Sequence, residues 1–212
     1  MIKLKDVSYY VLDEKTNAQK EILKDINIEF KKNKITVITG HNGSGKSTLM
    51  KLLMGISKPT SGEIYYNGTN ITDLSVTARA NLGITMAFQQ PVRFKGLTVK
   101  NLLDIASAKT TNLNDVCEYL SAVGLCAKEY INRELDGTLS GGELKRIELA
   151  MALAKGGEVF LFDEPEAGID LWSFEELIKI FKKLKNKTII IVSHQNKILE
   201  IADYVLLLNN IG

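Results

Sequence analysis

Several features are scarce in this sequence of 212 residues, and each scarcity narrows the class of protein that it can encode. Only two cysteines occur, Cys117 and Cys126, and their spacing is not that of metal ligands, so we expect both to pack within a helical region in a reducing compartment. No run of about 18 apolar residues is present, so no membrane-spanning helix is expected. The opening stretch MIKLKDVSYY lacks the apolar core of a secretory signal. We therefore expect a cytoplasmic protein.

Charge of one sign is not in excess either. The sequence has 27 basic and 25 acidic residues, which gives a formal net charge of +2. This balance offers no argument for a nucleic-acid partner, and we expect none. The lysine-rich stretch at 179–187 is expected to be the solvated end of a helix. The sequence shows no internal repeat, and its 45% of hydrophobic residues is typical of an ordinary globular protein.

What the sequence does contain is an alternation of apolar strands with helices. Alternating runs in the first 35 residues, separated by the polar DEKTNAQKE, predict a hairpin, whereas residues 97–135 have helical spacing. Elsewhere, apolar strands alternate with helical segments, which predicts an α/β fold with a parallel sheet buried on both faces. The expected strands are 35–39, 159–162, 188–194 and 204–208, and the expected helices are 48–55, 143–155, 174–184 and 196–204.

The stretch GHNGSGKST, at 40–48, matches the pattern G-x-x-x-x-G-K-[ST] and lies between an expected strand and an expected helix. Its glycines allow the backbone to bring N–H groups against phosphate oxygens, and the helix N-terminus adds partial positive charge. Lys46 is expected to reach the β- and γ-phosphates and the Ser47 hydroxyl to bind Mg²⁺. We therefore predict a nucleoside triphosphate site. The loop residues assigned to it are Gly40, His41, Asn42, Gly43, Ser44, Gly45, Lys46, Ser47 and Thr48.

A second element of the same chemistry is VFLFDE, an apolar strand that ends in two acids. The carboxyl ends of parallel strands line the ligand crevice of such a sheet. Asp163 is therefore expected near Mg²⁺, directly or through water. Glu164, one residue further out, is expected to polarise an attacking water as a general base.

The stretch LSGGE stands immediately before an expected helix. Ser140, Gly141 and Gly142 supply free N–H groups and a hydroxyl, which together make a second anion-binding helix end. One γ-phosphate does not need two helix N-termini from the same chain. We therefore expect these residues to bind the γ-phosphate of a nucleotide held by another copy, which predicts a head-to-tail dimer with two ATP molecules between the subunits.

Taken in order, the motifs resemble those of the ABC-type ATPases over essentially the whole chain: GHNGSGKST, FQQP, LSGGE, VFLFDE, AGID and VSH. The resemblance implies a single domain over 1–212 that hydrolyses ATP with Mg²⁺. It also implies a P-loop NTPase core with an N-terminal antiparallel β subdomain in 1–88 and 140–212, and an inserted helical subdomain in 89–139.

The same resemblance implies roles for three further residues. Gln89 would sense Mg²⁺ and the attacking water, and would couple the core to the helical insert. Asp170, at the end of AGID, would contact the opposite subunit at the dimer seam. His194 would touch the γ-phosphate.

Adenine recognition is expected to depart from the family pattern. Relatives usually stack the base on an aromatic residue near the N-terminal strand, but aligning VSYYVL puts Val11 at that place. Strand alternation gives Tyr9 and Val11 the same face. We expect apolar contact from Val11 with Tyr9 nearby, and looser selectivity for adenine.

The partner of the ATPase is the least determined property. The stretch MAFQQPV followed by KG, and the stretch FDEPEAGIDLWSF, resemble SufC, the ATPase of SUF iron–sulfur cluster assembly. This resemblance implies ATP-driven motion on a soluble SufB-like scaffold. The alternative is the ATP-binding subunit of a membrane transporter, peripheral to the inner face of the membrane and paired with a transmembrane permease subunit. The catalytic motifs do not separate these two roles.

Overall fold

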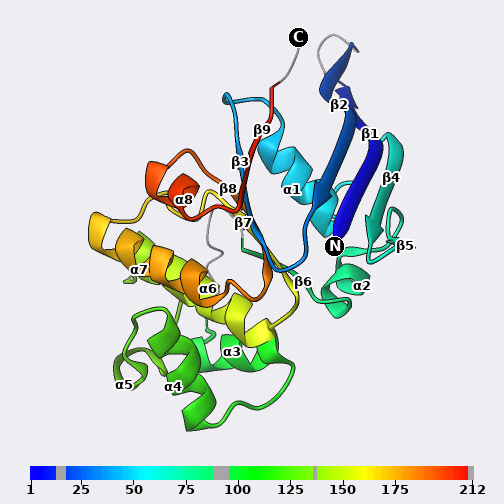
Figure 1. Ribbon diagram of the computed structural model, residues 1–212. Coiled ribbons are helices and arrows are strands. Elements are labelled where there is room, and N and C mark those ends of the chain that lie inside the picture. The colour runs from blue at the N-terminus through cyan, green and yellow to red at the C-terminus, as the bar shows by residue number, and fades with distance from the viewer. Residues whose placement is uncertain (13–17, 88–95, 136–137, 210–212) are drawn as a thin grey trace.

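The computed structural model describes residues 1–12, 18–87, 96–135 and 138–209. The chain forms two sheets, with helices packed between them and over the far side of one of them (Figure 1). Within this part of the chain, no helix is long and apolar enough to cross a membrane.

The N-terminal sheet is antiparallel, with strand order β2–β1–β4–β5 (Figure 1). The expected hairpin is confirmed, since the first two strands pair out to Leu12 opposite Gln19. The polar stretch 13–21 expected between the strands is partly strand, because residues 19–21 belong to β2, and 13–17 lie outside the described residues. The four strands are β1 (Ile2–Leu12), β2 (Gln19–Phe30), β4 (Ser61–Tyr66) and β5 (Thr69–Asn70).

The second sheet is parallel throughout, with strand order β6–β7–β8–β3–β9. Every residue of β7 and β8, two of its three interior strands, is buried, which confirms a sheet covered on both faces. The sequence pattern does not predict β6, because four residues are too few to show a periodicity. The five strands are β3 (Ile35–Thr39), β6 (Ile84–Ala87), β7 (Val159–Asp163), β8 (Thr188–Val192) and β9 (Tyr204–Leu207).

Helices cover both faces of the parallel sheet, and a separate helical group packs beyond one of them (Figure 1). In that group, α3 and α4 contact the long helix α6. The helices against the sheet are α1 (Lys46–Met54), α2 (Val76–Asn81), α6 (Gly141–Lys155), α7 (Leu171–Lys183) and α8 (Asn196–Glu200). The inserted group is α3 (Val99–Ser107), α4 (Leu113–Ala122) and α5 (Ala127–Tyr130).

The two faces of the parallel sheet belong to two different hydrophobic cores. Leu161 and Ile190 face the antiparallel sheet and α1, which lies between the sheets (Figure 1). Phe160, Phe162 and Ile191 face α6, α7 and the helical insert. Because side chains alternate along a strand, each central strand of the sheet contributes to both cores. The sheet therefore fixes the position of α1 relative to the loops that follow β7 and β8.

The apolar stripe predicted on α6 is confirmed. Leu144, Ile147, Ala150 and Ala154 are buried in the core beside the insert, and Met151 is partly buried against it. The boundaries proposed for the subdomains, 1–88, 89–139 and 140–212, remain predictions, because 88–95 and 136–137 are outside the described residues.

Two local expectations are corrected. The helix predicted to reach residue 204 ends at Glu200, because the Asp203 carboxylate accepts hydrogen bonds from the backbone N–H of Ile35 at 2.8 Å and from Lys34 Nζ at 2.9 Å. These bonds tie the chain to the start of β3 and allow β9 to begin. Cys126 is exposed at the N-terminus of α5 instead of packed, whereas Cys117 is half-buried in α4.

Candidate functional site

The loop between β3 and α1 has the backbone that the glycine pattern predicts. Gly43 and Gly45 have φ angles of 84° and 90°. A Cβ at Gly45 would lie 2.9 Å from the Ile22 carbonyl oxygen, so β2 lies directly against the loop. No side chain caps the N-terminus of α1, and Ser44 Oγ is buried without a hydrogen-bond partner among the described residues. A helix N-terminus without a side-chain cap and an unpaired buried hydroxyl fit a bound phosphate chain.

Lys46 is folded onto its own loop. Its side chain is buried, and Nζ donates hydrogen bonds to the carbonyl oxygens of Gly40 at 2.7 Å and His41 at 2.9 Å. The ammonium therefore lies at the centre of the loop, where phosphate oxygens can replace the carbonyl groups as acceptors.

Ser47 and Asp163 meet at the carboxyl end of β7. The Ser47 hydroxyl donates to Asp163 Oδ1 at 3.1 Å. Burial raises the pKa of the Asp163 carboxyl, and the hydrogen bond from Ser47 opposes that rise. A hydroxyl and a carboxylate oxygen this close are hard donors of the kind that Mg²⁺ takes together with phosphate oxygens, so the residues present fit this ion. Gln89, the third predicted metal ligand, lies outside the described residues.

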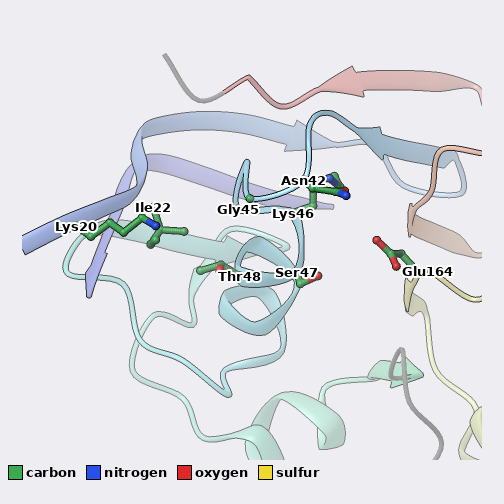
Figure 2. A pocket seen from close by; sticks show the side chains of 9 residues that line it. Lys20, Ile22, Asn42, Gly45, Lys46, Ser47, Thr48 and Glu164 are labelled. Atoms are coloured by element: carbon green, nitrogen blue, oxygen red, sulfur yellow. The ribbon is translucent and has the colours of Figure 1, made fainter. Parts of the chain in front are cut away.

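Glu164 follows Asp163 with an unusual backbone. Its φ angle is 45°, uncommon for a residue other than glycine, and its N–H donates to the Val192 carbonyl oxygen at 3.0 Å. Glu164 lines a cavity of about 490 Å³ whose other walls are the phosphate loop and two residues of β2, Lys20 and Ile22. Figure 2 shows Glu164 across this cavity from Lys20 and Ile22, with Lys46 and Ser47 between them. We call this space the loop cavity.

His194 lies just beyond the carboxyl end of β8, on the other side of the loop. Its Nδ1 is 3.2 Å from the Thr39 hydroxyl, and its side chain lines a second cavity of about 510 Å³ together with Gly40 and His41. Asn42 lines both cavities. The phosphate loop, Asp163, Glu164 and His194 are therefore brought together by the carboxyl ends of three neighbouring strands.

The wall that β2 gives to the loop cavity was not predicted from the sequence. The residues lining the cavity include Lys20 and Ile22, which the sequence did not single out, and do not include Val11 or Tyr9. Val11 is exposed and pairs directly with Lys20 across the hairpin, so it stands beside the cavity wall. Tyr9 packs against the core next to irregularities in the register of β1 and β2. Contact of either residue with adenine stays a prediction.

The residues of LSGGE lie apart from this group. Ser140, Gly141 and Gly142 are at the N-terminus of α6, and none of them lines the loop cavity or the second cavity. Asp170, immediately before α7, is exposed. A Cβ at Gly141 would lie 3.3 Å from the Gly168 carbonyl oxygen, so the loop that contains Asp170 passes close to this helix end.

The start of α6 is held by a network of hydrogen bonds. The Ser140 hydroxyl accepts from the Glu143 N–H at 3.2 Å, and the Glu143 carboxylate accepts from the Ser140 N–H at 2.7 Å. The Tyr130 hydroxyl also donates to the Glu143 carboxylate, and Arg133 Nη1 donates to Glu143 Oε1 at 3.3 Å. The Tyr130 hydroxyl contributes most to lowering the pKa of Glu143 to about 2. The helical insert thereby fixes the helix end that carries the glycine pair.

The fold and the loop define a P-loop nucleotide-binding protein, and the comparisons identify the family. The family described as ABC transporter matches residues 23–167, and a shorter match to the family described as AAA domain, putative AbiEii toxin, Type IV TA system, covers 137–200. The chain belongs to the ABC transporter family: it is an ABC ATPase with the cassette fold, and it binds and hydrolyses ATP.

Individual relatives cover nearly the whole chain. It is 39% identical, over 98% of its length and 85% of the relative's, to the uncharacterized ABC transporter ATP-binding protein MJ0035 of Methanocaldococcus jannaschii. It is 36% identical, over 100% of its length and 79% of the relative's, to the energy-coupling factor transporter ATP-binding protein EcfA1 of Mesomycoplasma hyopneumoniae. Among solved structures, it resembles the ATP-binding cassette MJ0796, a dimer in a post-hydrolysis state with ADP and Pi, with a TM-score of 0.87 and 27% identity over 99% of this chain and 94% of that one.

Proposed function

We propose that this chain is the ATP-binding subunit of a membrane transporter, peripheral to the inner face of the membrane, where it hydrolyses ATP to drive a transmembrane permease. The observation that carries the catalytic part is the convergence of Lys46, Ser47, Asp163, Glu164 and His194 around one loop. The relatives named above support the transport part, because they are named as transporter ATP-binding proteins.

In the proposed cycle, nucleotide enters the loop cavity and its phosphates take the place of the carbonyl groups that Lys46 contacts. Ser47 and Asp163 would hold Mg²⁺, which when bound would neutralise part of the phosphate charge. Glu164 orients a water molecule in line with the γ-phosphate and accepts its proton. His194 approaches the same phosphate from the second cavity.

The site is completed by a second copy of the chain. Ser140, Gly141 and Gly142 lie apart from the loop cavity of their own subunit and are free to face that of a partner. The Ser140 hydroxyl accepts a bond from Glu143 yet retains its own proton, so it can also donate to a γ-phosphate. Closing the dimer on two ATP molecules and opening it after hydrolysis provides the motion that a permease would follow.

The SufC-like role expected from the sequence lacks comparable support. The stretch MAFQQPV falls largely within 88–95, outside the described residues, and the relatives reported above are named for transport. ATP-driven motion on a SufB-like scaffold is therefore the second outcome of the test, not the proposal.

The test is an affinity pull-down of the tagged full chain from its native cells, with and without mild detergent. We use Glu164→Gln as the bait, because blocked hydrolysis retains the ATP-bound state, and Lys46→Ala as the control that cannot reach it. A multi-span membrane protein recovered with the bait only in detergent supports the proposal. A soluble SufB-like protein recovered without detergent would overturn the transport role and leave the ATPase assignment intact.

A further inference from the structure

The loops that follow β7 and β8 are joined by a carboxylate with no role in the ATP site described so far. Glu166 lies two residues after Glu164, and it accepts a hydrogen bond from the hydroxyl of Ser193. Ser193 immediately precedes His194, and its oxygen also accepts the N–H of Gln195 at 3.0 Å. One side chain therefore links the loop that carries the proposed general base to the loop that carries the histidine.

A glutamate at position 166 costs the fold stability, because part of its carboxylate is buried. Its Oε2 is buried and has no hydrogen-bond partner within the described part of the chain. Burial raises the pKa of this carboxyl, and the nearby charge of Glu164 raises it further. Hydrogen bonds from the Ser193 hydroxyl and from the backbone N–H groups of Glu166 and His194 lower the pKa and only partly offset the rise. An unpaired buried carboxylate oxygen destabilises a fold, so packing alone would be better met by an apolar side chain.

The backbone around Glu166 shows what the link holds. The Ala167 N–H donates to the Glu164 carbonyl oxygen at 3.0 Å, which closes a tight turn from 164 to 167 with Glu166 inside it. The Glu164 N–H is bonded in turn to Val192, the last residue of β8. The backbone of Glu164 is thus fixed to β8. Beyond the end of β8, the Glu166 carboxylate holds the loop that contains His194 to this turn.

We propose that Glu166 is a positioning residue of the ATPase: by holding Ser193 it keeps His194 in register with Glu164, so that both face one γ-phosphate at the same time. The inference rests on the proposed roles of Glu164 and His194. It does not depend on which partner the ATPase drives.

The chain offers a matched control for this bridge. Glu175 of α7 is hydrogen-bonded to Lys197 of α8, so it also links the segments after β7 and β8. The side chains of Glu175 and Lys197 are 45% and 50% exposed, and neither residue lines the loop cavity or the second cavity. Glu175→Ala removes a carboxylate link between the same two segments without touching the site.

The experiment measures steady-state phosphate release by the full chain for wild type, Glu166→Ala, Glu166→Gln, Ser193→Ala, the double alanine variant and Glu175→Ala, each corrected for its folded fraction. Glu166→Ala and Ser193→Ala are each expected to lower kcat by about 10- to 100-fold with KM for ATP within about twofold, because a displacement near 1 Å disturbs the chemical step more than binding. The double variant should lose no more than the worse single variant. Glu166→Gln should recover most of the activity, since its amide oxygen can still accept from Ser193.

Three results would overturn the proposal while wild type hydrolyses ATP: an unchanged kcat in Glu166→Ala, a glutamine variant as slow as the alanine variant, or losses that multiply in the double variant. If Glu166→Ala fails to fold, the result for Ser193→Ala is sufficient by itself. A kcat of Ser193→Ala equal to that of wild type would refute a positioning role for the Glu166–Ser193 hydrogen bond. An inactive wild type would contradict the proposed catalytic function instead.

Discussion

At the scale of single residues, Glu164 is the position where the backbone and the proposed chemistry are most closely linked. A left-handed conformation costs a residue with a Cβ about 1 kcal/mol or more, and glycine would adopt it freely. The hydrogen bonds from Glu164 to Val192 and from Ala167 to Glu164 hold the backbone in this conformation. The proposed role of Glu164 as general base would account for a carboxyl side chain at such a position.

Glu164→Gln is expected to lower the rate of ATP hydrolysis by about 10²- to 10⁴-fold while ATP binding stays close to wild type. The amide has nearly the same shape but cannot accept a proton, and Lys46 and Ser47 are untouched. Phosphate release and nucleotide titration measure the two properties. Glu158→Gln is the control, because Glu158 is an exposed carboxylate just before the opposite end of β7. Turnover within twofold of wild type would exclude Glu164 as the general base.

Val11→Tyr is expected to strengthen ATP binding, because Val11 stands opposite Lys20, which lines the loop cavity. An aromatic ring there can stack on the base, which is worth about 1–3 kcal/mol, or roughly 5- to 150-fold in affinity. Calorimetric titration with ATP and GTP measures both affinity and selectivity. Leu12→Tyr, one residue further along β1 and also exposed, is the control. Equal affinities for ATP in wild type and Val11→Tyr would place the base elsewhere.

At the scale of elements, the N-terminus of α6 depends on a contact from another helix. Tyr130 of α5 donates to Glu143, whose carboxylate in turn caps the Ser140 N–H. Movement of the helical insert would therefore change the support of the helix end that carries Ser140. This contact couples the helical insert to the proposed γ-phosphate contact.

The same network predicts an acid sensitivity. The pKa of Glu143 is about 2 in the fold, below its ordinary value of 4.5, so its contribution to stability is present above about pH 4.5 and is lost as the pH falls toward 2. Urea unfolding should show wild type more stable than Glu143→Gln at pH 6, with the difference shrinking at pH 3. Glu129→Gln, an exposed position on α5, should show no such trend. A difference independent of pH would contradict the assignment.

At the scale of the whole molecule, the two parts of the proposed ATP site do not meet within one chain. The phosphate loop, Glu164 and His194 line two adjoining cavities, and Asp163 is bonded to Ser47 of the loop, whereas Ser140 stands at the start of α6 and lines neither cavity. A γ-phosphate contact from Ser140 therefore requires a second copy. ATP binding and dimer formation should be separable by mutation.

Ser140→Arg in a Glu164→Gln background is expected to bind ATP but to remain monomeric, because the long cation fills the space that a partner's phosphate would occupy. Loss of the cap should lower stability by only about 1 kcal/mol, so the chain stays folded. Light scattering with Mg·ATP measures the mass. Ser121→Arg, on the exposed side of α4, should dimerise like the parent. A Ser140→Arg dimer would refute a site completed in trans.

Local pattern predicted much of this molecule. The parallel sheet, the N-terminal hairpin, the helical character of 97–135 and the turn of the loop at 40–48 follow from periodicity and glycine spacing, and the structure confirms them. Pattern failed where an element was short, as for β6, or where one distant contact decided its end, as Asp203 does for α8. Hydrogen bonds between residues far apart in sequence leave no local pattern.

The sequence by itself determined the chemistry of this protein, because a phosphate-binding loop, a strand ending in two acids and a glycine pair before a helix are each local arrangements that a short stretch encodes completely. Only the tertiary structure decided which residues share a cavity. Lys20 and Ile22 reach the loop cavity because β2 passes against Gly45, and Glu166 meets Ser193 because β7 and β8 are neighbours in the sheet. The order and register of the strands determine these contacts, and both depend on the packing of the entire chain.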